Sequence, residues 1–167
     1  MPKANNIISI DDTKFIYETN FSGDPAKDHF GDSRRKCNII IPDPRQAEDL
    51  LAKGFRVKKT KPGPDDDPDD YIPTYFVQAV LKYRDRYGKE LKYAPKVYLV
   101  NADNEPVPMD EESVKCLDNI RASNVNVILN AWETDDGGFS LYIRTMYVEQ
   151  DFDDDPYAAR YAKRKGE

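Results

Sequence analysis

Two long runs of alternating residues near the carboxyl end constrain the fold more than any other feature. They span residues 125–133 and 139–149, and a short loop that ends in Gly137 and Gly138 separates them. A period of two is typical of a strand with one buried face, and two such runs around a glycine-containing loop predict a β-hairpin. With the further strands described below, this hairpin predicts a mainly β fold.

The period of two assigns each side chain of the hairpin to a face. The core face is expected to hold Val125, Val127, Leu129 and Ala131 on the first strand, and Phe139, Leu141, Ile143 and Tyr147 on the second. The opposite face then holds Asn126, Ile128, Asn130 and Trp132 on the first strand, and Tyr142 and Arg144 on the second.

The loop length also predicts which side chains of the outer face are neighbours. If Glu133 pairs with Phe139, Trp132 lies diagonal to Tyr142. The only tryptophan of the chain, this tyrosine and Arg144 then form one exposed patch, whose shape suits the stacking of bases. The alternative is that Trp132 packs beneath a loop or helix, as lone tryptophans commonly do.

The remaining segments predict further short strands and two short helices. Strand patterns cover residues 7–18, 34–41, 55–61, 75–83 and 96–100. A turn near Gly88 is expected to join the last two strands into a hairpin. The first helix has Asp43 as its N-cap, Pro44 at its first position and Gly54 just past its end. The second helix opens at residues 110–112, with acidic side chains at its positive end.

Acidic and basic residues occupy separate segments. The formal net charge is −6 at pH 7, which argues against a generally basic coat for duplex DNA. Aspartates gather in a loop at residues 62–70, beside the basic strand 55–61, and at the start of a tail, residues 151–167, whose end is basic. Residues 1–150 are expected to form one domain, and this separation of charges allows it a local basic groove.

Cations alternate with tyrosines between residues 82 and 98. The members of this stretch are Lys82, Tyr83, Arg84, Arg86, Tyr87, Lys89, Lys92, Tyr93, Lys96 and Tyr98. Lysine and arginine neutralise phosphates while tyrosine rings stack on unpaired bases, so the stretch suits single-stranded nucleic acid bound without reading its sequence. The other interpretation is an exposed charged hairpin whose tyrosines pack over their own strands.

Several motifs between residues 15 and 150 keep a distinctive order and spacing. They are Phe21-Ser22-Gly23, Gly31 with Arg34 and Arg35, and the segments 38–42, 54–58, 96–100, 117–119 and 142–148. In this order they resemble the OB-fold single-stranded-DNA-binding proteins encoded by tailed phages. The resemblance implies a five-stranded, partly open, OB-fold-like Greek-key barrel with a groove across one sheet face. It also implies a role in protecting displaced strands during phage replication or recombination, although the acidic insert at residues 64–70 departs from the family pattern.

The leading hypothesis is a non-catalytic, sequence-independent binder of single-stranded DNA. Phosphate contacts are expected from Arg34, Arg35, Arg56, Lys58, Arg84, Arg86, Lys89 and Arg144. Base stacking is expected from Tyr87, Tyr93, Trp132 and Tyr142. The alternative is an acidic protein-interaction module, such as an inhibitor that imitates DNA, and the net charge and the two aspartate blocks support it.

An enzyme, a cofactor and a metal site are not expected. The acids lie mainly in proline-broken loops instead of converging on a pocket, and His29 has no serine or cysteine nucleophile context. Cys37 and Cys116 fall in elements with a core-like pattern, which predicts buried, reduced thiols and, with His29 alone beside them, no zinc site.

The location and partners of the chain follow from its apolar pattern and its tail. No apolar run approaches membrane-spanning length, so a cytoplasmic location is expected, in the host cell if the protein is phage-encoded. Replication or recombination proteins are candidate partners of residues 151–167.

Overall fold

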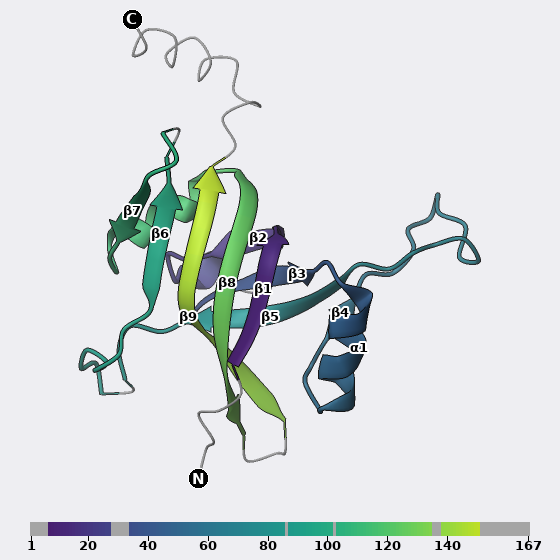
Figure 1. Cartoon of the computed structure of the whole chain (residues 1–167), viewed down its shortest axis with the longest axis horizontal. Coiled ribbons are helices and arrows are strands. Elements are labelled where there is room, and N and C mark those ends of the chain that lie inside the picture. Colours follow the sequence, from purple (N-terminus) through teal and green to yellow (C-terminus); the bar gives the residue numbers. More distant parts are fainter. Residues whose placement is uncertain (1–6, 28–33, 86, 102, 135–137, 151–167) are drawn as a thin grey trace, which may run out of the picture.

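The computed structural model describes residues 7–27, 34–85, 87–101, 103–134 and 138–150 (Figure 1). Within these residues, the strands are β1 (Ile7–Thr13), β2 (Phe15–Asn20), β3 (Arg35–Ile41), β4 (Lys58–Lys59), β5 (Tyr75–Leu81), β6 (Lys96–Val100), β7 (Pro106–Met109), β8 (Ala122–Glu133) and β9 (Phe139–Gln150). The helical segments are α1 (Pro44–Ala52) and the 3₁₀ segments η1 (Pro25–Lys27) and η2 (Ser113–Asn119).

The sheet curls until its two ends approach each other. Its main path runs β1-β8-β9-β5-β3-β2, with β4 paired to β5 and the β6–β7 hairpin paired to β9. The end strands β1 and β2 are consecutive in the chain and meet at Lys14, whose carbonyl accepts a hydrogen bond from the Ile40 N–H at 3.0 Å. The Thr13 hydroxyl donates to the Ile40 carbonyl. The result is an open, OB-like barrel, which confirms the predicted mainly β class.

The number of strands and one pairing differ from the prediction. The described residues form a sheet of nine strands, not five, because short strands are added to the barrel beside β5 and β9. The hairpin predicted between residues 75–83 and 96–100 is wrong, since β6 pairs in parallel with β9 from Lys96↔Thr145 to Val100↔Glu149. Strand β9 is long enough to pair with both β6 and β5 along the edge opposite β8. Its pairing with β5 is limited to Tyr142. Because β5 and β6 both run parallel to β9, they point in the same direction, and residues 82–95 form the long connection between them.

The β8–β9 hairpin has the predicted register at its tip. Glu133 pairs with Phe139, Trp132 with Ser140 and Asn130 with Tyr142. The expected core face of β8 is buried, and so are Leu141 and Ile143 on β9.

A bulge in β9 explains why the core assignment of Tyr147 is wrong. Ile128 pairs with Thr145 but Leu129 pairs with Ile143, so β9 has one extra residue at Arg144. An extra residue reverses the side-chain alternation beyond it. Met146 and Val148 therefore point into the core, and Tyr147 lies on the outer face with 37% of its surface exposed.

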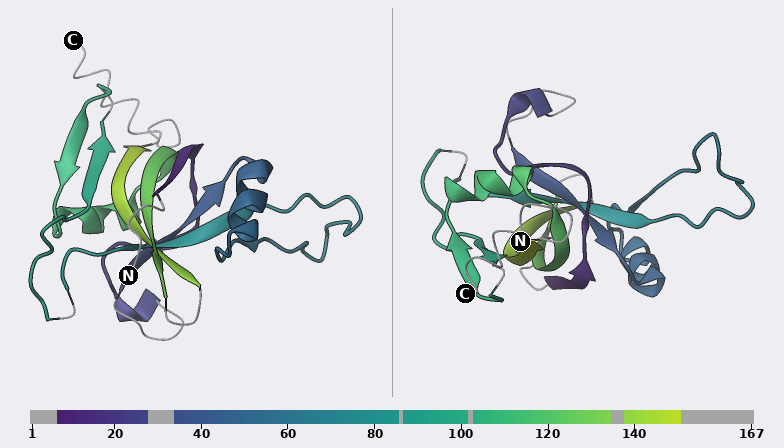
Figure 2. Two further views of the ribbon diagram at one scale, coloured as in Figure 1. Left: turned by 60° about the horizontal axis from the view of Figure 1, so that its bottom comes forward. Right: turned by 90° about the horizontal axis from the view of Figure 1, so that it is seen from above.

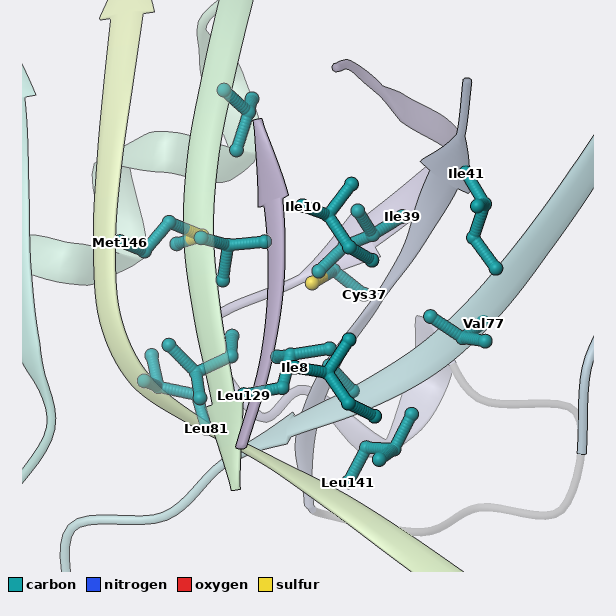
Figure 3. Close-up of a cluster of buried hydrophobic side chains, with 14 of the residues drawn as sticks. Ile8, Ile10, Cys37, Ile39, Ile41, Val77, Leu81, Leu129, Leu141 and Met146 are labelled. Carbon is teal, nitrogen blue, oxygen red and sulfur yellow. The ribbon is translucent and has the colours of Figure 1, made fainter. Parts of the chain in front are cut away.

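The core lies between the β1-β8-β9 layer and the β3-β5 layer (Figure 3). Ile10 from β1, Ile39 from β3, and Leu129 and Met146 from the hairpin are fully buried there. Because successive side chains alternate between faces, the residues between these core positions point outward.

The segment that follows helix α1 packs against the tip of the β8–β9 hairpin. The Asp43 side chain accepts a hydrogen bond from the Arg45 N–H at 3.0 Å, which confirms the predicted N-cap. Gly54 just past the helix has a φ of 93°, a conformation that glycine adopts without strain. The next residue, Phe55, stacks on Phe139 with ring centroids 4.3 Å apart. This contact holds the start of β9, directly opposite the strand end that carries Trp132.

Asp118 of η2 joins two of the sequence motifs that lie far apart in the chain. Its carboxylate accepts hydrogen bonds from the N–H groups of Phe21 at 2.7 Å and Ser22 at 2.9 Å, and from the Thr19 hydroxyl at 2.8 Å. Burial alone would raise the pKa of Asp118, but these hydrogen bonds outweigh it and hold the pKa below its usual value. The carboxylate therefore fixes the loop after β2 as long as it is ionised.

The two cysteines differ in exposure. Cys37 is buried, as predicted, and its burial, with a further contribution from the Asp118 charge, raises the pKa of its thiol far above the usual value. The prediction for Cys116 is wrong, because η2 buries Val114 and Leu117 and leaves Cys116 exposed.

The predicted acidic loop forms an arm that projects from the barrel between β4 and β5 (Figures 1 and 2). Its base is closed by a backbone hydrogen bond from Thr60 to Thr74 at 3.0 Å and by a contact of 2.6 Å between the Thr60 and Tyr71 hydroxyls. The aspartates of residues 65–70 are all exposed. In both figures the arm and the connection formed by residues 82–95 lie at opposite ends of the molecule. Among the described residues, the helices are too short or too polar to cross a membrane.

Candidate nucleic-acid interface

A cavity of about 1100 Å³ opens on the outer face of the β8–β9 hairpin, and we call it the Trp132 groove. It is lined by Lys82, Leu91, Lys92, Tyr93, Ala94, Pro95, Lys96, Asn130, Trp132, Tyr142, Ile143, Arg144 and Thr145. Strands β8 and β9 supply its floor, and residues 91–95 of the long connection supply a wall. The groove therefore depends on the parallel pairing of β6 with β9, which brings the connection alongside the hairpin.

Aromatic rings come from both the floor and the wall of the groove. Because Trp132 pairs with Ser140 and Asn130 pairs with Tyr142, the two floor rings are diagonal neighbours on one face, as the sequence predicted. Trp132 is 37% exposed and Tyr93 on the wall is 84% exposed. Trp132 is thus not packed beneath a loop or helix, and these rings can receive flat, unpaired bases.

Among the residues that the structure describes, the charged side chains of the groove are all cations. Lys82, Lys92, Lys96 and Arg144 line it, and this described lining contains no aspartate or glutamate. The Lys82 ammonium lies 5.7 Å from the centre of the Tyr142 ring, and the Lys92 ammonium lies 5.6 Å from the centre of the Tyr93 ring. Positive charge beside aromatic faces gives a polyanion with bases two kinds of contact at the same place.

A stacked tyrosine pair continues the outer face beyond the groove. Tyr98 on β6 pairs with Tyr147 on β9, with ring centroids 4.7 Å apart and an interplanar angle of 14°. The pair follows Lys96, which lines the groove, by two residues along β6. Sequence reasoning missed the pair because it placed Tyr147 in the core.

The structure brings together four of the predicted site residues. Tyr93, Trp132, Tyr142 and Arg144 all line the groove. Lys82, Lys92 and Lys96 also line it, although they were not among the selected residues. The signal for these lysines was present, since they belong to the alternating stretch 82–98.

Two of the predicted arginines have structural contacts. The Arg35 guanidinium donates to the Phe21 carbonyl at 3.0 Å and to the Glu111 carbonyl at 2.7 Å, and it lies 5.5 Å from the centre of the Tyr83 ring. Arg84 donates from Nε to both carboxylate oxygens of Glu111, at 2.9 and 3.0 Å. These contacts fix the start of the long connection to the segment before η2. Burial raises the pKa of Tyr83 beside them to about 12, although the Arg35 charge acts in the opposite direction.

The other predicted residues that the structure describes lie outside the groove lining. Arg34, Arg56, Lys58, Tyr87 and Lys89 are exposed. Tyr87 and Lys89 belong to a turn in which both of their N–H groups donate to the Asp85 carboxylate. Lys58 lies on β4, paired with Phe76 of β5. Arg86 lies outside the described residues.

No protein-family model matches the chain, and no curated protein matches it in sequence. Among solved structures, the crystal structure of gp2.5, a single-stranded DNA binding protein encoded by bacteriophage T7, is similar over 91% of this chain and 97% of its own. The two share 16% sequence identity, and the TM-score is 0.41. The function proposed below therefore rests on the side chains of the Trp132 groove.

Proposed function

We propose that the protein binds single-stranded DNA, independently of sequence, in the Trp132 groove. The observation that carries this proposal is a groove whose described lining holds four cations and no carboxylate, in a chain whose net charge is −6. Trp132, Tyr142 and Tyr93 add ring faces on which bases stack, and every base has such a face whatever its identity.

The experiment is a titration of the protein with oligo-dT while Trp132 fluorescence is followed. Trp132 is the only tryptophan of the chain, so quenching reports on the groove itself. Each phosphate contact contributes about 0.7 to the log–log slope of affinity against salt for a single strand, so the four cations predict a slope of roughly 3. An absence of binding and of quenching at low salt would contradict the proposal.

We also propose that the role is non-catalytic. Among the described residues, the groove lining includes no carboxylate, histidine or cysteine, the side chains that most often hold catalytic metals. We therefore propose a binding protein that works without a cofactor. Degradation of DNA by the pure protein with Mg²⁺ would contradict this.

The biological setting is a further part of the proposal. The motif resemblance to phage-encoded OB-fold proteins supports a role in protecting displaced strands during phage replication or recombination, in the host cytoplasm. Residues 151–167, the predicted contact for replication or recombination proteins, lie outside the described residues.

The acidic arm favours a second candidate function, a protein-interaction module. Its exposed aspartates at residues 65–70 project from the barrel at the end opposite the connection formed by residues 82–95 (Figure 2). We propose as the alternative that this surface imitates DNA toward a basic partner. A pull-down from nuclease-treated lysate separates the two functions, since only the alternative predicts a complex that survives the removal of nucleic acid.

A further inference from the structure

Tyr17 of β2 is an exposed ring outside the lining of the Trp132 groove. It has a φ of 63°, which is rare for a residue other than glycine, and it lies where the β2–β3 register is interrupted between Ile16 and Asn20. Its surface is 63% exposed. Its ring meets the ring of Phe76 edge to face, with centroids 5.4 Å apart.

Phe76 belongs to the outer face of the barrel although it is only 6% exposed. It is not a member of the hydrophobic core cluster, whereas its neighbour Val77 is. Tyr17 therefore packs on a buried ring that lies outside the main core cluster. The pair presents an aromatic surface at the junction of β2, β4 and β5.

The outward positions of β3 and β5 beside this pair carry no acid, whereas β2 carries the exposed Glu18 next to Tyr17. Cys37, Ile39 and Ile41 of β3 and Val77, Ala79 and Leu81 of β5 point into the core. The alternate, outward positions are Lys36, Asn38 and Ile40 on β3, and Phe76, Gln78 and Val80 on β5. Lys58 of β4 pairs with Phe76 and shares its face. In a chain with a net charge of −6, the outward strip of β3, β4 and β5, which carries two lysines and no carboxylate, is a path for a polyanion.

This strip is continuous with the Trp132 groove. Val80 pairs in parallel with Tyr142, so the outward side of β5 and the Tyr142 side of β9 are one surface. The next outward residue after Val80 is Lys82, whose ammonium lies over the Tyr142 ring. Phe76 and Val80 are four residues apart on β5, a separation of about 13 Å at 3.3 Å per residue.

We propose that Tyr17 is a second base-stacking position, reached by single-stranded DNA that leaves the groove along the outer face of β5. Lys58 and Lys36 contact phosphates along this path. This inference rests on the proposed function and extends it, because it assigns the DNA a route from the groove to β4. It also gives a role to Lys58, which the sequence selected but which the groove does not use.

The test compares a short with a long oligo-dT, of about 4 and about 16 nucleotides, the range that one OB-fold covers. A short oligonucleotide can be held by the groove alone, whereas a long one also reaches Tyr17. The test variant is Tyr17→Asn, because asparagine tolerates a positive φ and has no ring. Tyr17→Phe is the matched control, which keeps the ring and loses only the hydroxyl. Anisotropy of the labelled DNA measures binding, and thermal unfolding verifies that each variant is folded.

We expect Tyr17→Asn to weaken binding of the long oligonucleotide by about fivefold or more, the loss of one stacked base, with the short one unchanged. Lys58→Gln is expected to lower the salt slope for the long oligonucleotide by about 0.7 and to leave the slope for the short one unchanged. Tyr17→Phe is expected to bind both lengths like the wild type.

Three results overturn the inference, and they are distinguishable. If folded Tyr17→Asn binds the long oligonucleotide as tightly as the wild type, Tyr17 does not contact DNA although the groove does. An equal loss at both lengths means that Tyr17 supports the fold and not the path. If the wild type binds neither length, the proposed function itself fails.

Discussion

The most direct prediction concerns Tyr142, the ring at the centre of the Trp132 groove. Tyr142 is diagonal to Trp132, lies beneath the Lys82 ammonium, and pairs with both β5 and β8. Replacing it with alanine removes one stacking face and leaves the charges of the groove unchanged. Tyr142→Ala should therefore lower affinity for oligo-dT with little change in salt dependence.

The size of the effect follows from the energy of one stacked base. Stacking of a base on an aromatic side chain contributes about 1 to 3 kcal/mol, and about 1.4 kcal/mol corresponds to a tenfold change in Kd, so we expect binding to weaken about 5- to 150-fold. The salt slope should remain roughly 3, because the phosphate contacts of the four cations are retained. Trp132 is present in the variant, so its fluorescence quenching measures both quantities.

Two other tyrosine variants make this test specific to the groove. Tyr142→Phe keeps the ring and should bind within about a factor of two of the wild type, since the ring face provides the stacking energy. Tyr87→Ala removes a ring that is 76% exposed and lies outside the groove lining, and it should leave Kd for a short oligonucleotide unchanged. The reasoning is refuted if Tyr142→Ala binds like the wild type, or if Tyr87→Ala loses as much affinity as Tyr142→Ala.

Three further predictions concern the fold and the arm. Asp118→Ala should lower the free energy of unfolding by about 1 to 2 kcal/mol in urea, because two backbone N–H groups lose their acceptor. Since the folded pKa of Asp118 is lowered, its contribution is present above the unfolded pKa and is lost as the pH falls through the folded pKa. The melting temperature of the wild type should thus fall more steeply in acid than that of Asp118→Ala, and parallel curves would contradict this. Iodoacetamide should modify Cys116 in the folded protein and Cys37 only after denaturation, as peptide mass spectrometry can verify. Replacing the aspartates of residues 65–70 with asparagine should tighten binding of a long oligonucleotide at low salt and leave binding of a short one unchanged. The reason is that the arm adjoins β4 and not the groove. An equal gain in affinity at both lengths would contradict the proposed DNA path along β5 to β4.

Local patterns in the sequence determined the parts of the structure that involve residues close together in the chain. The period of two and the short loop predicted that Glu133 pairs with Phe139, and hence that Trp132 lies diagonal to Tyr142. Likewise, Asp43 and Gly54 predicted the two ends of α1. These features depend on backbone geometry and on hydrogen bonds within a few residues, which the local sequence specifies.

Pairing between segments distant in the chain determined the strand neighbours and side-chain faces that the sequence did not predict. The predicted β5–β6 hairpin was wrong because β6 pairs along its whole length with β9, and no local pattern in the sequence identifies a parallel partner. The bulge at Arg144 reversed the faces beyond it and moved Tyr147 outward. A single extra residue in a strand leaves the alternation on either side intact, so its effect on the faces is visible only in the paired register.

The charged residues show the same division. The sequence determined that cations and rings are concentrated between residues 82 and 98 in an acidic chain. Only the tertiary structure decided that Lys82, Lys92 and Lys96 line the groove while Arg84 pairs with Glu111 and Arg35 with backbone carbonyls. The physical reason is that a cation is available to a ligand only after folding has determined which acceptors surround it. Those acceptors come from segments that are distant in the chain.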